Sequence, residues 1–118
     1  MDPSWATTES KIQVRASKKF ISRCDVVKIR MDAEEGLDPS KDLIDISWNI
    51  HITDMDIDEN LNFMLQKLIN ESKGKPIFIL DHNFTQKLQV GSFVKIVGYA
   101  EGKDGAQVMD MEIVEVRN

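Results

Sequence analysis

Hydrophobic and polar residues alternate along two stretches in the first half of the chain. Across residues 27–31 a hydrophobic residue occupies every second position, and the basic residues Lys28 and Arg30 fill the positions between them. Residues 44–53 show the same pattern more clearly. Their apolar positions are Ile44, Ile46, Trp48, Ile50 and Ile52. A period of two is typical of a strand with one buried and one solvent-exposed face, so both stretches are predicted to be strands. The second is predicted to be a central strand, with Trp48 in the core.

The period changes to that of a helix within residues 55–75. One apolar stripe there is formed by Leu61, Met64, Leu65, Leu68 and Ile69. Spacings of three and four residues place such a stripe on one helix face, and acidic residues just before it suit the positive end of the helix dipole. We expect a helix of about three to four turns, with Asp56 and Glu59 as a capping box and a stop at Gly74.

The remaining elements return to strand. Residues 76–80 are short, apolar and β-rich, and residues 81–87 are expected to form a turn. Residues 92–99 and 106–116 then form a hairpin joined through 100–105, where glycines can adopt a positive φ. Strands, one helix and strands again favour a small five-stranded barrel capped by a helix over alternating βα units. Another small barrel, such as an SH3-like one, is the main alternative.

Length and composition fit a single domain. The chain has 118 residues, of which 42% are hydrophobic and 30% charged, enough for one core and too few for two ordinary domains. Residues 1–10 are predicted to be a flexible tail and 11–118 the folded domain. The single Cys24 favours a reducing compartment, and no stretch resembles a signal peptide or a membrane span. We therefore expect a soluble protein.

Charge is distributed unevenly along the chain. The net charge is −5, which opposes binding to a polyanion, but residues 11–30 are distinctly basic. They contain Lys11, Arg15, Lys18, Lys19, Arg23, Lys28 and Arg30 against Asp25 alone. Residues 31–60 are acidic. One face suited to an anion and another suited to water or a basic protein is one interpretation; solvated strand faces and loops are the other.

The sequence contains no strong catalytic or metal-binding motif. Cys24, His82 and Asp81 could make a nucleophile, base and orienting group only if the fold brought them together, and a buried, inert Cys24 is the simpler expectation. Two histidines and one cysteine, widely spaced, are not a recognisable ligand set. The glycines of residues 98–105 lie between strands, where a phosphate loop is not expected. We expect no enzyme, no metal and no cofactor.

The closing hairpin carries a resemblance to a known family. Leu88, Gly91, Val94, Ile96 or Val97, and Gly98, followed by a turn and an apolar strand ending in MEIVEV, resemble the last two strands of oligonucleotide/oligosaccharide-binding (OB) folds. The similarity is greatest to the small subunits of replication protein A and of the telomeric CST complex. It covers residues 88–116. The sequence departs from the family in residues 76–84, which intervene between the helix and this motif.

The resemblance implies a five-stranded OB-type barrel and a role with single-stranded DNA in telomere protection, replication or repair, in the nucleus. OB barrels bind single strands with basic residues on phosphates and exposed aromatics on bases. The candidate DNA contacts are Lys18, Lys19, Arg23, Lys28 and Arg30 for phosphates, with Phe20, Phe84 and Tyr99 for stacking. Aromatic residues make up only 7% of the chain, too few for a stacking platform.

This shortage favours a scaffolding subunit over a primary DNA-binding protein. The resemblance implies larger OB-fold subunits as partners, with single-stranded DNA bound through the complex. Candidate partner contacts on the helix are Phe63, Met64 and Lys67. Two alternatives stay open: a protein-protein interaction module outside nucleic-acid metabolism, and a primary single-stranded nucleic-acid-binding protein.

Overall fold

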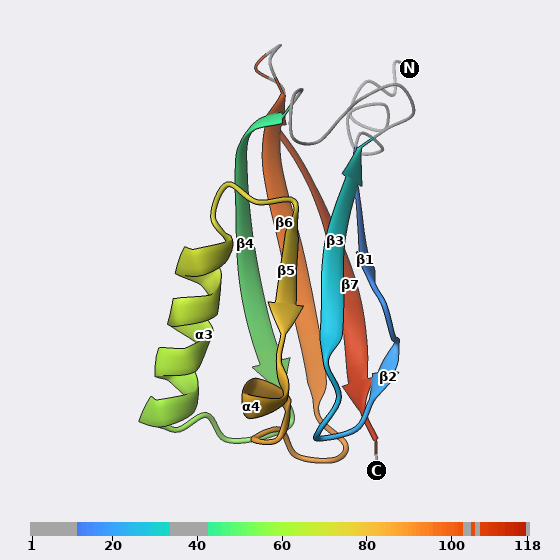
Figure 1. Cartoon of the computed structure of the whole chain (residues 1–118), viewed down its shortest axis with the longest axis vertical. Helices are drawn as coiled ribbons and strands as arrows, with labels where there is room; N and C mark the ends of the chain where they lie inside the picture. Colours follow the sequence, from blue (N-terminus) through green and yellow to red (C-terminus); the bar gives the residue numbers. More distant parts are fainter. Residues whose placement is uncertain (1–11, 34–42, 103–104, 106, 118) are drawn as a thin grey trace, which may run out of the picture.

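The computed structural model describes residues 12–33, 43–102, 105 and 107–117, which form two β-sheets and two helices (Figure 1). The elements in chain order are β1 (Ile12–Ala16), β2 (Phe20–Ile21), β3 (Val27–Ala33), β4 (Leu43–Thr53), α3 (Glu59–Ser72), β5 (Ile77–Leu80), α4 (His82–Thr85), β6 (Phe93–Gly102) and β7 (Gln107–Val116). The prediction of a mainly β protein with one long helix is confirmed. The predicted tail, residues 1–10, lies outside the described residues.

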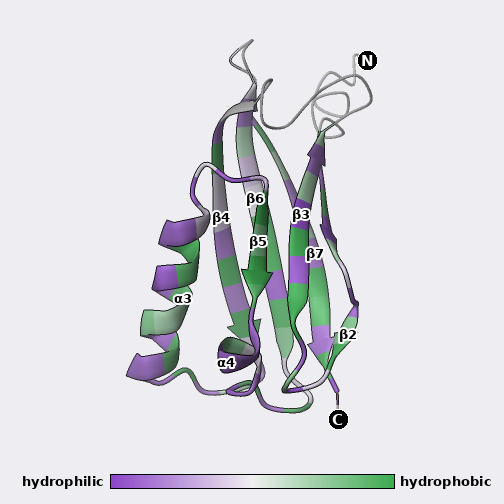
Figure 2. Cartoon of the chain, viewed as in Figure 1, coloured by the Kyte–Doolittle hydropathy of each residue, from purple (hydrophilic) through white to green (hydrophobic). Residues whose placement is uncertain are grey.

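The strands divide into two sheets that face each other. Sheet A has the order β1-β3-β5 and is antiparallel throughout; sheet B has the order β2-β7-β6-β4 and is antiparallel except for the short β2-β7 pair. Side chains that point between the sheets form the core, and Figure 2 shows apolar and polar residues alternating along the strands. The predicted alternation is confirmed in β3 and in β4, where Ile46, Trp48 and Ile50 are buried.

The two sheets approach each other most closely where β1 lies beside β7. The backbone N–H of Val14 in β1 donates a hydrogen bond to Oδ2 of Asp110 in β7, over 2.8 Å. Further along β7, β2 adds two parallel pairs, Phe20 with Glu115 and Ile21 with Val116. Within the described residues the strands number seven rather than five, and neither sheet closes on itself. The predicted five-stranded barrel is therefore not confirmed.

Helix α3 covers the opposite side of the molecule, between β4 and β5 (Figure 1). Its buried residues include Leu61 and Leu65 of the predicted stripe. The helix starts later than the predicted capping box requires. Asp58 is the N-cap, because its carboxylate lies one position before the first helical residue and accepts a hydrogen bond from the N–H of Leu61 at 2.7 Å. The prediction of Asp56 as the cap is wrong.

The end of α3 is held against β4 by two hydrogen bonds. The N–H of Gly74, which has a φ of 80°, donates to the carbonyl of Ile46 at 2.7 Å. The indole Nε1–H of Trp48 donates to the carbonyl of Lys75 at 2.8 Å. The predicted stop at Gly74 thus coincides with the point where the helix connection is fastened to the sheet.

Residues 81–87, predicted as a turn, contain a short helix, α4. The Asp81 carboxylate accepts from the N–H of Phe84 at 3.1 Å. The hydroxyl of Thr85 donates to the carbonyl of Asp25 at 2.7 Å, which ties α4 to the connection before β3. No helix among the described residues is long and apolar enough to cross a membrane.

Candidate nucleic-acid interface

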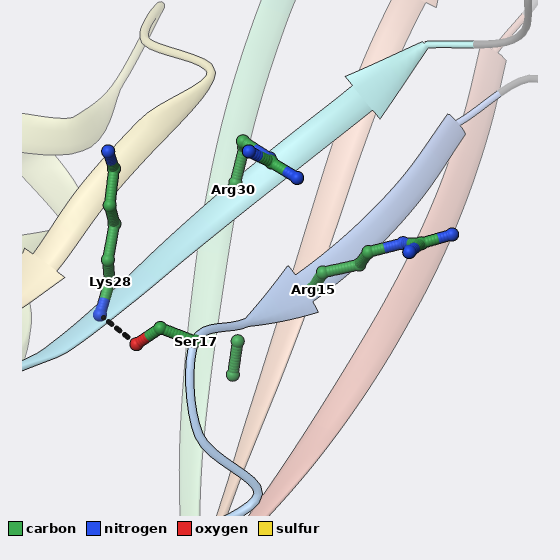
Figure 3. Close-up of a pocket in the computed structure, with 5 residues that line it drawn as sticks. Arg15, Ser17, Lys28 and Arg30 are labelled. Atoms are coloured by element: carbon green, nitrogen blue, oxygen red, sulfur yellow. Dashed lines mark hydrogen bonds between the residues drawn. The ribbon is translucent and has the colours of Figure 1, made fainter.

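Three cationic side chains share the outer face of sheet A: Arg15 on β1 and Lys28 and Arg30 on β3, together called here the basic face (Figure 3). All three are exposed. Their neighbours Val14, in β1, and Ile29, in β3, point into the core. Arg15 and Arg30 are direct cross-strand partners in the antiparallel ladder, and Lys28 lies two residues before Arg30 on the same side. The alternation of each strand thus concentrates positive charge on one surface.

A shallow pocket of about 190 Å³ lies within the basic face. Its lining consists of Arg15, Ala16, Ser17, Lys28 and Arg30. Ser17 fixes the local backbone, because its N–H donates to the carbonyl of Lys28 at 2.8 Å and its Oγ accepts from the N–H of Lys28 at 3.0 Å (Figure 3). These bonds hold the end of β1 beside β3. They engage only the backbone of Lys28, not its ammonium group.

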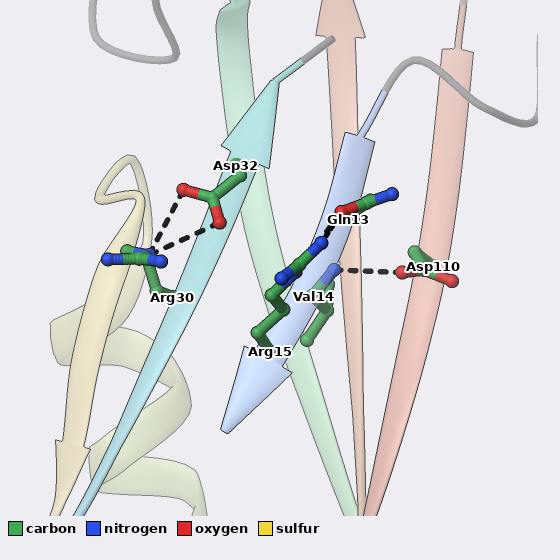
Figure 4. A network of polar contacts seen from close by, with 6 residues as sticks. All are labelled: Gln13, Val14, Arg15, Arg30, Asp32 and Asp110. Atoms are coloured by element: carbon green, nitrogen blue, oxygen red, sulfur yellow. Dashed lines mark hydrogen bonds and ion pairs between the residues drawn. The ribbon is translucent and has the colours of Figure 1, made fainter. Parts of the chain in front are cut away.

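One carboxylate partly offsets the charge of the basic face. Arg30 Nε lies 3.0 Å from Asp32 Oδ1, whereas Arg15 Nε donates to the neutral amide oxygen of Gln13 at 3.1 Å (Figure 4). Like charges directly opposite each other on neighbouring strands are unfavourable. A bound anion between Arg15 and Arg30 would relieve their repulsion, and a phosphate oxygen is the kind of acceptor that guanidinium groups bind well.

The basic face continues onto an aliphatic edge. Ile77 and Ile79 of β5 are exposed and are the cross-strand partners of Arg30 and Lys28. The outer face of sheet A, as far as it is described, carries no aromatic side chain. The arrangement can therefore contact phosphates and cover apolar groups, but it cannot stack on bases in the way that a platform of aromatic rings does.

Of the predicted phosphate contacts, the structure brings together Lys28 and Arg30 on one face and leaves the other three in the loops around β2. Lys18 Nζ lies 3.4 Å from Asp25 Oδ1. Arg23 donates to the carbonyl of Gln86 at 3.2 Å. The pKa of Asp25 is lowered, first by the hydrogen bond from the backbone N–H of Ser22 and further by the charge of Lys18. Lys18 and Arg23 thus already have partners within the chain.

The predicted stacking residues do not share a surface with the basic face. Phe84 is 1% exposed and lies in the core, so its prediction as a stacking residue is wrong: α4 turns its ring inward where a polar turn was expected. Tyr99 is exposed on the outer face of sheet B. The ring of Phe20 lies beneath the guanidinium group of Arg117, 3.6 Å from its centroid.

The predicted partner contacts do lie together. Phe63, Met64 and Lys67 line a pocket of about 280 Å³ between α3 and α4, with Asp81 and Phe84 on its other side. The side chain of Phe63 is 69% exposed, the largest value among the exposed large hydrophobic residues described. Their role in binding a partner stays a prediction.

Two features of the surface escaped the sequence analysis. Arg15 belongs to the basic face, but in the sequence it was only one of seven basic residues. Its outward position could have been inferred from the alternation of β1, in which Ile12 and Val14 are buried and Arg15 falls in the other phase. The second feature is an exposed apolar column on β7. The signal there was ambiguous, because hydrophobic residues occupy both phases of residues 107–116.

The residues considered for catalysis are placed as follows. Cys24 is exposed in the connection between β2 and β3, so the expectation that it is buried is wrong. The Asp81 carboxylate caps α4, and His82 is the exposed first residue of that helix. No group of three or more potential metal ligands occurs among the described residues. The sequence matches no protein-family model and no curated protein.

Proposed function

We propose that this chain is a non-catalytic subunit of a nuclear assembly that binds single-stranded DNA in telomere protection, replication or repair. The observation that carries the proposal is the basic face, in which Arg15, Lys28 and Arg30 converge around one pocket. Phosphate contacts of this kind give sequence-independent binding that falls steeply with salt. The chain contributes phosphate contacts to the assembly and takes most of its affinity from a partner.

Weak intrinsic binding follows from the composition of that face. Three cations can neutralise few phosphates, the net charge of −5 opposes the approach of a polyanion, and stacking rings are absent from the described outer face of sheet A. The partner is a larger subunit of the OB class, which fits the resemblance of residues 88–116. In this proposal the two sheets are an opened form of the five-stranded OB-type barrel, with β2 and β5 added and α3 over the open side.

The proposal predicts a specific loss of DNA binding when the basic face is neutralised. We expect the purified protein to bind a fluorescent oligothymidine with a Kd of about 1 µM or weaker at 150 mM salt, and more tightly as salt is lowered. The triple variant Arg15→Gln, Lys28→Gln, Arg30→Gln should lose at least about tenfold in affinity, because each contact releases counterions. The measurement is fluorescence anisotropy over a salt series.

The matched control is Lys18→Gln, Lys19→Gln, Arg23→Gln, which removes the same charge from the loops around β2. It should weaken binding far less, since Lys18 and Arg23 already have internal partners. Equal losses in the two triples would show that only net charge matters and would remove the basic face as a site. Nanomolar, salt-tolerant binding would instead make the chain a primary DNA-binding protein.

A second prediction concerns the partner. Phe63→Glu should abolish association with the larger subunit without changing the melting temperature, because the Phe63 ring is exposed beside the α3-α4 pocket. Tagged wild-type and variant chains are purified from cells that contain the natural partner. The co-purifying DNA-binding subunit is identified by mass spectrometry and its affinity for DNA is measured. Gln66→Glu, an exposed change on α3 outside the pocket lining, is the control. Recovery of the same subunit with Phe63→Glu would place the contact elsewhere.

A further inference from the structure

The final strand has apolar residues in the phase that faces solvent. Val108, Val114 and Val116 point into the core as expected of β7. The alternate positions Met109, Met111 and Ile113 are 47%, 42% and 50% exposed. Two acidic residues of the inner phase, Asp110 and Glu112, are half-buried instead. An exposed run of large hydrophobic side chains along one strand costs solubility, and such patches mark sites of interaction.

These side chains form a continuous surface on sheet B. Tyr99 of β6 is the cross-strand partner of Met109, and Val97 is the partner of Met111. The apolar column is defined here as Tyr99, Met109, Met111 and Ile113. It lies on a different sheet from the basic face and is not part of the α3-α4 pocket. The DNA contact and the Phe63 contact of the proposed function therefore leave it uncovered.

A partner must approach this surface from above rather than extend the sheet. β7 pairs with β6 on one side. On its other side β2 pairs with its last two residues and β1 lies beside the strand, so β1 obstructs the addition of a further strand there. From Met109 to Ile113 the column spans about 13 Å. An α-helix of about nine residues has the same length, and flexible methionines adapt well to the side chains of a docked helix.

The charges around the column indicate which end of a docked helix should carry basic side chains. Asp45 and Glu101 are cross-strand partners at one end, where with Tyr99 they line a hollow of about 260 Å³. No ion pair within the described part of the chain engages either carboxylate. At the other end Lys95 lies opposite Ile113, and Glu115 pairs with Arg117 at 3.3 Å. Among the residues that the structure describes, the acidic end is thus the one without a cation paired to its carboxylates.

We infer that the outer face of sheet B is a docking surface for an amphipathic α-helix of a partner protein, with an apolar stripe over Met109, Met111 and Ile113 and basic side chains at the Asp45 and Glu101 end. Charge complementarity selects this partner. A second copy of this chain is a poorer fit because each copy carries a net charge of −5. The inference goes beyond the proposed function, since it assigns a protein ligand to a surface which that function does not use.

The test uses two model peptides and no DNA, so its result is independent of the basic face. Both peptides have about fifteen residues and the same leucine stripe; one has a lysine-rich polar face and the other a glutamate-rich one. Binding is followed by NMR of the methionine methyl groups and by anisotropy. The lysine peptide should shift the Met109 and Met111 methyl signals and bind at least about tenfold more tightly than the glutamate peptide.

Variants separate the apolar column from general attraction to an acidic protein. Met111→Lys should reduce binding of the lysine peptide at least about tenfold. Ile79→Lys, which makes the same charge change at an exposed isoleucine on sheet A, should leave it nearly unchanged. Asp45→Asn with Glu101→Gln should weaken the lysine peptide and not the glutamate peptide.

Three results would overturn the inference. Methyl shifts that avoid Met109 and Met111 would place the peptide elsewhere. Equal losses in Met111→Lys and Ile79→Lys would reduce the effect to net charge. A wild-type protein that is dimeric by light scattering and becomes monomeric on Met111→Lys would assign the surface to a second copy of the chain.

Discussion

Replacing Trp48 with alanine should lower the free energy of unfolding by about 3–5 kcal/mol, the largest effect expected of a single substitution here. The side chain is 3% exposed in the middle of β4. Its ring meets that of Phe78 edge to face, with centroids 4.8 Å apart. Its Nε1–H satisfies the carbonyl of Lys75 beside the end of α3. The substitution leaves a cavity between both sheets and removes the anchor of the helix connection. Urea denaturation monitored by circular dichroism measures the loss.

Trp48→Phe separates the two contributions. It keeps an aromatic ring against Phe78 but leaves the Lys75 carbonyl without its donor, for which we expect a cost of about 1–2 kcal/mol beyond any packing defect. An unfolding midpoint unchanged in Trp48→Ala would mean that Trp48 does not hold the sheets together. It would then have to be reconsidered as a surface residue available for stacking.

Gly98→Ala should lower the free energy of unfolding by about 1–3 kcal/mol. Gly98 lies on β6, where side chains of sheet A pack directly against its backbone, and an added Cβ would stand 2.7 Å from Met31 Cε and 2.8 Å from Val14 Cγ2. The Met31 methyl can move, but Val14 is fixed in β1 by the hydrogen bond from its N–H to Asp110. The intrinsic gain from replacing a strand glycine is about 0.5–1 kcal/mol, which is too small to offset a clash of this size.

A double-mutant cycle shows whether the clash with Val14 causes this loss. Val14→Ala alone should also destabilise the protein, because it empties part of the core. Combined with Gly98→Ala, the total loss should be smaller than the sum of the two by about 0.5–3 kcal/mol. Strict additivity would mean that the sheets move apart to accept the methyl group, and that the close contact at Gly98 contributes little to stability.

The sequence predicted those elements whose hydrophobic period had one solution. In β3, in residues 44–53 and in the stripe of α3 most apolar residues occupy a single phase, so burial determines which face turns inward. Short elements carry too few residues for a period. Residues 81–87 are predicted to form a turn, yet α4 forms there with Phe84 in the core. The contacts of α4 are distant in sequence: Phe84 lies beside α3, and Thr85 donates to the carbonyl of Asp25.

The candidate site was predictable only to the level of a basic segment. Residues 11–30 carry seven basic side chains against one acid, but the sequence does not reveal that Arg15 and Arg30 become cross-strand partners while Lys18 pairs with Asp25. Those outcomes depend on where β1 ends and on the register of the β1-β3 ladder. Both are set by local hydrogen bonds such as those of Ser17.

The hydrogen bond between Val14 and Asp110 also bears on how the last strand finds its register. If β7 slipped by one residue along β6, Met109, Met111 and Ile113 would be buried in place of Val108, Val114 and Val116. Gln107 and Glu115 would then turn inward in place of Asp110 and Glu112. Apolar burial alone therefore does not favour the native pairing. The native register is selected by polar and backbone contacts: Asp110 with Val14, Glu115 N–H with the Lys19 carbonyl, and Arg117 N–H with that of Ile21. The need for a single register thus limits how hydrophobic the outer phase of β7 can become, because each more hydrophobic side chain on that surface would also stabilise the shifted register.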